Sequence, residues 1–213
     1  MKKTTRLISL AALAVLGAAS CGQPQEKTNE QTSENTVIET IMNRRSIRKY
    51  QDRSVEREKL QQIAECGVNA PNGMNRQTWE VRIVDSKAAI DSVTAVFKTA
   101  NPEMVQRDEN FKNMFRNAPA VIAIAVPEGD SGLNAGLMAE NMILAAQSLG
   151  LGTCCLGGPI AFIKSNPDAA WFFEGLKFSE GYDLCLMIAV GYPDETPEAK
   201  PRDLNKIQFV DWE

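Results

Sequence analysis

Histidine is absent from this 213-residue sequence. Its absence excludes a Ser-His-Asp triad, a Cys-His nucleophile pair and every metal site that needs a histidine ligand. Long apolar runs are also missing beyond the N-terminus, which excludes a protein with several membrane spans. The remaining composition is ordinary, since 44% of the residues are hydrophobic and 23% are charged. The length therefore predicts one folded domain with at most a short tail.

The first 21 residues have the features of an export signal. Lys2, Lys3 and Arg6 precede an apolar stretch over residues 7–19, which is too short to span a bilayer comfortably. Small residues then lead to Cys21, which resembles the lipobox of bacterial lipoproteins, although Ala18 stands where leucine is usual. We expect residues 1–20 to be a signal peptide and Cys21 to be lipidated. The protein would then be anchored in the cell envelope, on the periplasmic or outer face of a bacterial membrane. The alternative is an ordinary signal peptide with an incidental cysteine.

The net charge of the chain and the spacing of its cysteines limit the ligands and partners that it can bind. Without residues 1–20 the chain keeps 20 basic and 27 acidic residues, and such a surface does not favour nucleic acid or anionic lipid. We therefore expect contact with the membrane only through the lipid anchor. The other cysteines match no zinc-binding pattern, and we expect them to be free and mostly buried: Cys66, Cys154, Cys155 and Cys185.

Residues 21–35 are polar and lack aromatic side chains, which predicts a flexible tether. The folded domain is expected over residues 36–213. Ile38, Ile41 and Met42 would form the apolar face of an opening helix, and a second helix after Ser54 would end with Gly67 as its C-cap.

Further helices are expected over residues 86–97 and 132–149, with helical turns over 167–176. Strands are expected over residues 79–84, 118–126, 153–156 and 184–190, and the second of these should be buried on both faces because it is continuously apolar. No helix is expected directly behind Gly157 and Gly158. This order predicts an α+β fold, an α/β sandwich with helices covering a small sheet.

Five short segments carry candidate chemistry. The first holds three arginines and a serine within five residues, which suits a phosphate and a second electron-rich group: Arg44, Arg45, Ser46 and Arg48. In the second, Asn75 and Gln77 offer amides that suit the carbonyl and imide edges of a heterocycle. Read alone, the first segment could be a solvated helix end and the second a turn.

Each of the remaining three segments, read alone, allows both a ligand-binding role and a plain structural one. Gly157 and Gly158 permit a flat ligand to approach the backbone, or they mark a simple turn. Lys200 and Arg202 flank a proline and form a cation pair or a charged tail, and Asn110 is a polar ligand contact or an exposed helix end.

In order and separation, these segments together resemble the nitroreductase family of FMN-dependent oxidoreductases, from residue 36 to the C-terminus. The family's Pro-Ser-x-x-Asn-x-Gln-Pro-Trp segment corresponds to residues 71–79, where Asn72 replaces the serine and Thr78 the proline. The resemblance implies a nitroreductase-like fold with a mainly antiparallel central sheet. It also implies a homodimer with FMN at the interface, where the segment from Pro71 would reach the partner's cofactor.

The resemblance further implies roles for individual residues. Arg44, with Arg45 beside it, would hold the FMN phosphate together with Lys200 and Arg202. Ser46 would contact the pyrimidine end of the flavin, and Arg48 would face the N1/O2 side. The backbone at Gly157 and Gly158 would approach flavin N5. The other expected cofactor contacts are Pro71, Asn72, Asn75, Gln77 and Asn110.

The implied activity is two-electron reduction of a nitro, quinone or similar small-molecule acceptor by NADH or NADPH in ping-pong order. No protein residue is expected as catalytic acid, because solvent can supply the proton, and no metal is expected. The alternatives are reductive dehalogenation or flavin processing on the same fold, a catalytically silent flavin-binding lipoprotein, and a purely structural envelope lipoprotein.

Overall fold

The computed structural model describes residues 36–212, so the expected signal peptide, Cys21 and the tether lie outside the described residues. Its centre is one four-stranded sheet in which every pair of neighbours is antiparallel. The strands are β1 (Glu80–Val84), β2 (Ala120–Pro127), β3 (Gly152–Leu156) and β4 (Tyr182–Gly191), in the order β1-β2-β4-β3. The predicted α+β fold with a mainly antiparallel sheet is confirmed.

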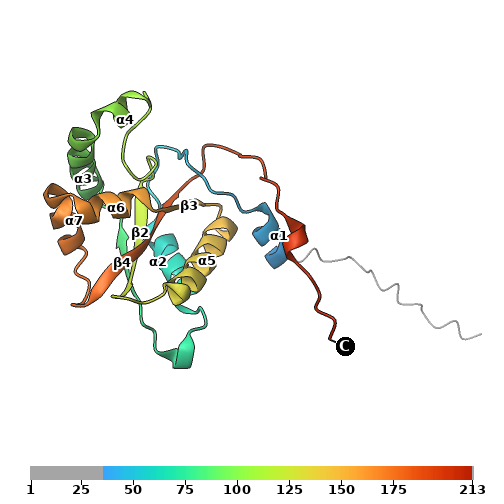
Figure 1. Ribbon diagram of the computed structural model, residues 1–213. Coiled ribbons are helices and arrows are strands. Elements are labelled where there is room, and N and C mark those ends of the chain that lie inside the picture. The colour runs from blue at the N-terminus through green and yellow to red at the C-terminus, as the bar shows by residue number, and fades with distance from the viewer. Residues whose placement is uncertain (1–35, 213) are drawn as a thin grey trace, which may run out of the picture. The chain divides into compact units, whose positions relative to one another are not determined.

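Helices cover both faces of the sheet (Figure 1). On one face, α2 (Arg57–Val68) and α5 (Leu133–Ser148) share a buried cluster with Ile122 and Ile124 of β2. On the other, α3 (Lys87–Ala100), α6 (Gly158–Ser165) and α7 (Ala170–Gly175) share a cluster with Val121 and Ala123 of β2. Strand β2 is therefore buried on both faces, as its continuous apolar run predicts.

The remaining elements are short or peripheral. Two further helices, α1 (Thr36–Asn43) and α4 (Pro102–Gln106), precede α2 and β2 respectively. Three 3₁₀ turns lie at Gly73–Asn75, Pro167–Ala169 and Leu204–Lys206. None of the described helices has both the length and the apolar character that crossing a membrane requires.

The prediction for Gly67 was wrong. This glycine lies inside α2, which continues to Val68 and has Asn69 as its C-cap. A Cβ at Gly67 would lie 2.3 Å from Met142 Cε and 2.6 Å from Met142 Cγ. The glycine therefore serves the close packing of α2 against α5 rather than a turn.

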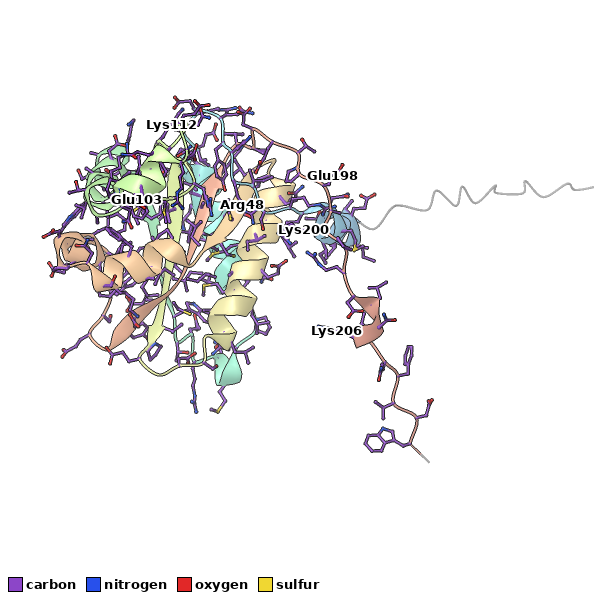
Figure 2. The ribbon with its side chains drawn as sticks, turned by 45° about the horizontal axis from the view of Figure 1, so that its top comes forward. Arg48, Glu103, Lys112, Glu198, Lys200 and Lys206 are labelled. Carbon is purple, nitrogen blue, oxygen red and sulfur yellow. The ribbon has the colours of Figure 1, made fainter. Side chains whose placement is uncertain are left out.

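Two segments leave apolar side chains outside the core. Helix α1 forms where predicted, but Ile41 and Met42 on its apolar face are 47% and 68% exposed. The C-terminal tail runs past α1 in extended form (Figures 1 and 2), and its Phe209 and Trp212 are 99% and 91% exposed. The protein's own core thus covers neither of these apolar surfaces.

Candidate functional site

The arginine-rich segment lies along strand β3. Ser46 forms a parallel bridge with Thr153, and the Ile47 amide donates to the Thr153 carbonyl at 2.8 Å. Gly152 makes this approach possible, because a Cβ there would lie 2.6 Å from Ile47 Cγ1. Residues 44–48 therefore extend the edge of the sheet, although more than 100 residues separate them from β3 in the chain.

The segment is also fixed at its far end. Tyr50 forms an antiparallel bridge with Pro193, and its buried hydroxyl donates to the Ile47 carbonyl at 2.7 Å. Gly191 accommodates the ring, since a Cβ there would lie 2.7 Å from Tyr50 Cδ1. Burial raises the pKa of Tyr50, so the phenol stays neutral at physiological pH. These contacts hold the arginines on a rigid backbone.

The three arginines point to different surroundings. Arg44 has a side chain that is 24% exposed and lies 3.9 Å from the Glu140 carboxylate of α5. Arg48 is exposed, and its guanidinium donates only to the Ser46 carbonyl, at 3.2 Å, among the described residues. The backbone amide of Arg48 donates to Glu195. Arg44 and Arg48 therefore present charge along one edge of the sheet.

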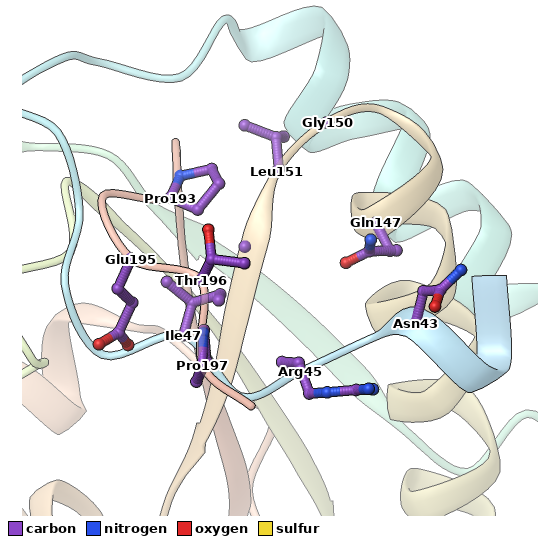
Figure 3. A pocket seen from close by; sticks show the side chains of 11 residues that line it. Asn43, Arg45, Ile47, Gln147, Gly150, Leu151, Pro193, Glu195, Thr196 and Pro197 are labelled. Carbon is purple, nitrogen blue, oxygen red and sulfur yellow. The ribbon is translucent and has the colours of Figure 1, made fainter. Parts of the chain in front are cut away.

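Arg45 lines a cleft of about 210 Å³ with Gln147, Glu195 and Gly152, the first residue of β3 (Figure 3). There its guanidinium donates to the carbonyls of Met42 and Arg44 at 2.7 and 2.8 Å. These bonds stiffen the turn after α1.

Gly157 and Gly158 follow β3 directly and are exposed. A Cβ at either position would meet nothing within 4 Å, and Gly157 has an ordinary φ of −94°. Neither packing nor the backbone at Gly157 requires glycine, so the open space above them is free for a ligand. The expectation of no helix here was wrong: α6 begins at Gly158, and its first-turn amides add hydrogen-bond donors.

The burial of the cysteines differs in part from the prediction. The structure shows all four described cysteines free, but Cys155 is exposed while Cys154 is buried. Successive strand residues face opposite sides, so Cys155 lies on the side of Arg44 and Glu140, whose charges act on its thiol. Period-two alternation in the predicted strand could have revealed this difference.

The segment over residues 71–77 lies in another part of the fold than the arginine segment. It forms the turn at the bottom of Figure 1, away from α1 and the residues that follow it. Met74, Asn75 and Gln77 have left-handed φ values of 52°, 51° and 51°, and the Gln77 amide donates to Asn72 Oδ1 at 2.9 Å. Pro71, Asn75 and Gln77 are exposed. One copy of the protein does not bring these amides to its own Arg44 and Arg48.

The other predicted contacts are exposed as well. The Asn110 carbonyl accepts from Asn117 Nδ2 at 2.8 Å, while the Asn110 side chain has no hydrogen-bond partner among residues 36–212. Lys200 and Arg202 lie on the tail, and Arg202 donates to the Lys200 carbonyl at 3.1 Å. Among the described residues, neither Lys200 nor Arg202 forms an ion pair with a carboxylate.

The decisive comparison is with protein families. The sequence profile of the nitroreductase family matches residues 41–192, which includes the arginine segment, the open glycines and the whole sheet. The chain belongs to the nitroreductase family.

Individual nitroreductase relatives agree with this assignment. An NADPH-flavin oxidoreductase of Vibrio harveyi is 29% identical over 174 residues, which cover 79% of this chain and 70% of the relative. The crystal structure of a nitroreductase with bound FMN from Desulfitobacterium hafniense superposes with a TM-score of 0.73 at 26% identity. It covers 83% of this chain and 99% of that chain. An FMN-dependent nitroreductase from Clostridium difficile gives a TM-score of 0.65 at 26% identity, with coverage of 83% and 99%.

The donor set of this member of the family suits an anionic, planar ligand. Arg44 and Arg48 lie on the segment that pairs with β3, the first-turn amides of α6 follow the end of that strand, and the exposed glycines leave room for a flat ring. Among residues 36–212, no group of three Cys, Asp or Glu side chains is arranged to hold a metal ion. The arginines and the α6 amides offer binding and electrostatic groups for such a ligand.

Proposed function

We propose that this protein is a flavin-dependent oxidoreductase that binds FMN and uses NADH or NADPH to reduce a nitro, quinone or similar acceptor in ping-pong order. The observation that carries the proposal is the pairing of residues 44–48 with β3 immediately before Gly157 and Gly158. This pairing joins the predicted phosphate ligands to the predicted ring contacts on one edge of the sheet.

The residues present fit FMN. Arg44 would supply a charge-assisted donor to the phosphate. Its ion pair with Glu140 is long, at 3.9 Å, and the Glu140 side chain is 54% exposed, so Arg44 can exchange this partner for a phosphate. Gly157 and Gly158 leave their backbone open to the ring, where a Cβ would otherwise occupy the space. Arg48 has no carboxylate bound to its guanidinium among the described residues, so its charge is available to the pyrimidine end.

When it is bound, FMN supplies the two-electron chemistry of such a reaction, and the protein supplies binding, orientation and electrostatics. The amide of Gly158 would donate a hydrogen bond toward N5. Arg48 favours the form of the cofactor that carries more negative charge. Solvent can supply the proton that the acceptor needs, so no protein residue is assigned as a catalytic acid.

The proposal includes a homodimer that completes the site. Apolar surface remains exposed on α1 and on the tail, where Ile41, Met42, Phe209 and Trp212 face outward. A second copy that covers this surface would gain hydrophobic burial of about 25 cal/mol for each Å². The same arrangement would let the segment over residues 71–77 and the tail cations, Lys200 and Arg202, serve the cofactor of the other copy.

The test uses the full mature chain. Purified protein should be yellow, with flavin absorption that bleaches when NADH or NADPH is added without oxygen and returns when a nitroaromatic or quinone follows. Yellow protein that neither nicotinamide reduces would indicate a silent flavin-binding protein instead. Colourless protein that takes up no FMN would contradict the proposal. Sedimentation or light scattering should report a dimer, and a monomer that binds FMN at full affinity would remove the shared site.

We also propose that Cys21 is lipidated and anchors the protein to a bacterial membrane in the cell envelope. The support is the charge and apolar pattern of residues 1–20 and the small residues before Cys21. A Cys21→Ala variant should move from the membrane fraction to the soluble fraction and lose incorporation of labelled fatty acid. A variant that stays in the membrane fraction would contradict the anchor.

A further inference from the structure

Arg116 is held in a backbone conformation that residues other than glycine rarely adopt. Its φ is 60°, and that of the following Asn117 is 63°. Left-handed backbone at two successive residues with Cβ atoms persists only where the surrounding structure imposes it. The side chain of Arg116 is exposed.

Hydrogen bonds within the loop impose this conformation. Asn117 Oδ1 accepts from the amides of Lys112 and Asn113 at 2.8 and 2.9 Å, and Asn117 Nδ2 donates to the Asn110 carbonyl at 2.8 Å. The buried Asn113 donates to the Ala118 carbonyl at 3.1 Å. Residues 110–118 thus form a rigid loop with Arg116 near its end.

The loop contacts the chain just beyond the arginine segment. Lys112 lies 3.3 Å from the Asp52 carboxylate, four residues beyond Arg48. Phe115, directly before Arg116, is fully buried in the cluster that contains Tyr50 and Cys154. Arg116 therefore leaves the loop at the place where the segment over residues 44–52 and β3 meet.

The guanidiniums of Arg48 and Arg116 act on the same two buried groups. Arg48 and Arg116 both act to lower the pKa of Tyr50 and the pKa of Cys154, against the opposing effects of burial and Glu195. Neither guanidinium forms an ion pair within residues 36–212, and Arg116 makes no hydrogen bond there. Glu195 lies here too, but its carboxylate accepts from the backbone amide of Arg48 and not from a guanidinium. Two guanidiniums without ion pairs at one place favour an additional anionic group there.

We propose that Arg116 is a second cation at the pyrimidine end of the bound flavin and that, with Arg48, it sets the flavin's reduction potential. This inference rests on the proposed FMN-dependent function. Two electrons and one proton give reduced FMN one more negative charge than oxidised FMN, and a nearby guanidinium binds the more negative form more tightly. Arg116 acts through charge and has no role in proton transfer.

The experiment measures the midpoint potential of the FMN-loaded protein. Arg116→Gln should weaken binding of reduced FMN relative to oxidised FMN by roughly tenfold, which corresponds to a potential about 30 mV lower for a two-electron couple. Arg116→Lys should recover much of the difference. Arg107→Gln is the matched control, because it removes one positive charge from a side chain that is 80% exposed and pairs with Glu103. It should leave the potential unchanged.

A second variant separates this role from a structural one. Arg116→Gly relieves the left-handed strain, so the melting temperature of the FMN-free protein should rise while the potential falls. If Arg116→Gln and Arg107→Gln give the same potential as the wild type in yellow protein, the Arg116 role is wrong and the flavin function stands. If no variant, wild type included, takes up FMN, both proposals fail together.

Discussion

Gly152 begins β3 and Gly157 directly follows it, and the structure assigns these two glycines opposite reasons for lacking a side chain. At Gly152 an added Cβ would lie 2.6 Å from Ile47 Cγ1 and 2.8 Å from Ile47 Cβ. Gly152→Ala should therefore push residues 44–48 off the strand and destabilise the FMN-free protein by about 1–3 kcal/mol. For a chain of this size, each kcal/mol lowers the melting temperature by about 2–4 °C.

At Gly157 an added Cβ would meet nothing, and its φ of −94° suits any residue. Gly157→Ala should leave the FMN-free protein as stable as the wild type, or more stable by about 0.4–1 kcal/mol because the unfolded chain loses freedom. Its FMN affinity should fall by about tenfold or more, because the methyl group enters the space proposed for the ring.

Thermal melting of both FMN-free variants and fluorescence titration with FMN provide the comparison. Equal destabilisation by the two substitutions would refute the assignment of open space at Gly157. Wild-type FMN affinity in Gly157→Ala would show that no ring lies against this backbone.

Three more predictions test other parts of the structure. Arg44→Ala should weaken FMN binding by about 1.5–3 kcal/mol, the worth of one charge-assisted contact, whereas Arg57→Ala, whose ion pair with Asp85 lies on exposed surface, should bind FMN normally in the same titration. The Tyr192 hydroxyl and Arg53 hold the pKa of Glu56 at about 2, below its usual 4.5. The stabilisation this gives is complete above pH 4.5 and disappears as the pH falls toward 2. Denaturant melts should show the wild type losing more stability than Glu56→Gln across that window, and parallel curves would contradict the assignment. Gly67→Ala should cost about 1–3 kcal/mol by crowding Met142, and an unchanged melting temperature would show that α2 and α5 have room to separate.

Much of the secondary structure was predictable because its causes are local. The unbroken apolar run of β2 indicates burial on both faces, and Ser86 marks the start of α3, where its hydroxyl accepts from the Ala89 amide. Helix α6 was missed because its eight residues begin with the second of two glycines and carry only a short apolar pattern. Gly67 was misassigned because a glycine near a helix end fits a C-cap as well as a close packing contact inside the helix. Only the position of Met142 shows that packing is its role.

The sequence by itself determined most of the elements, the order of the five candidate segments and the likeness to nitroreductases. Only the tertiary structure decided which of these segments meet: residues 44–48 lie on β3, whereas the turn over residues 71–77 lies elsewhere. It alone revealed Arg116, whose left-handed backbone and docking on the arginine segment leave no periodic signal. The physical reason is that helical and strand periodicity reports the burial of neighbouring residues. Contacts across a hundred residues depend on how the buried faces pack, and single glycines such as Gly152 permit them.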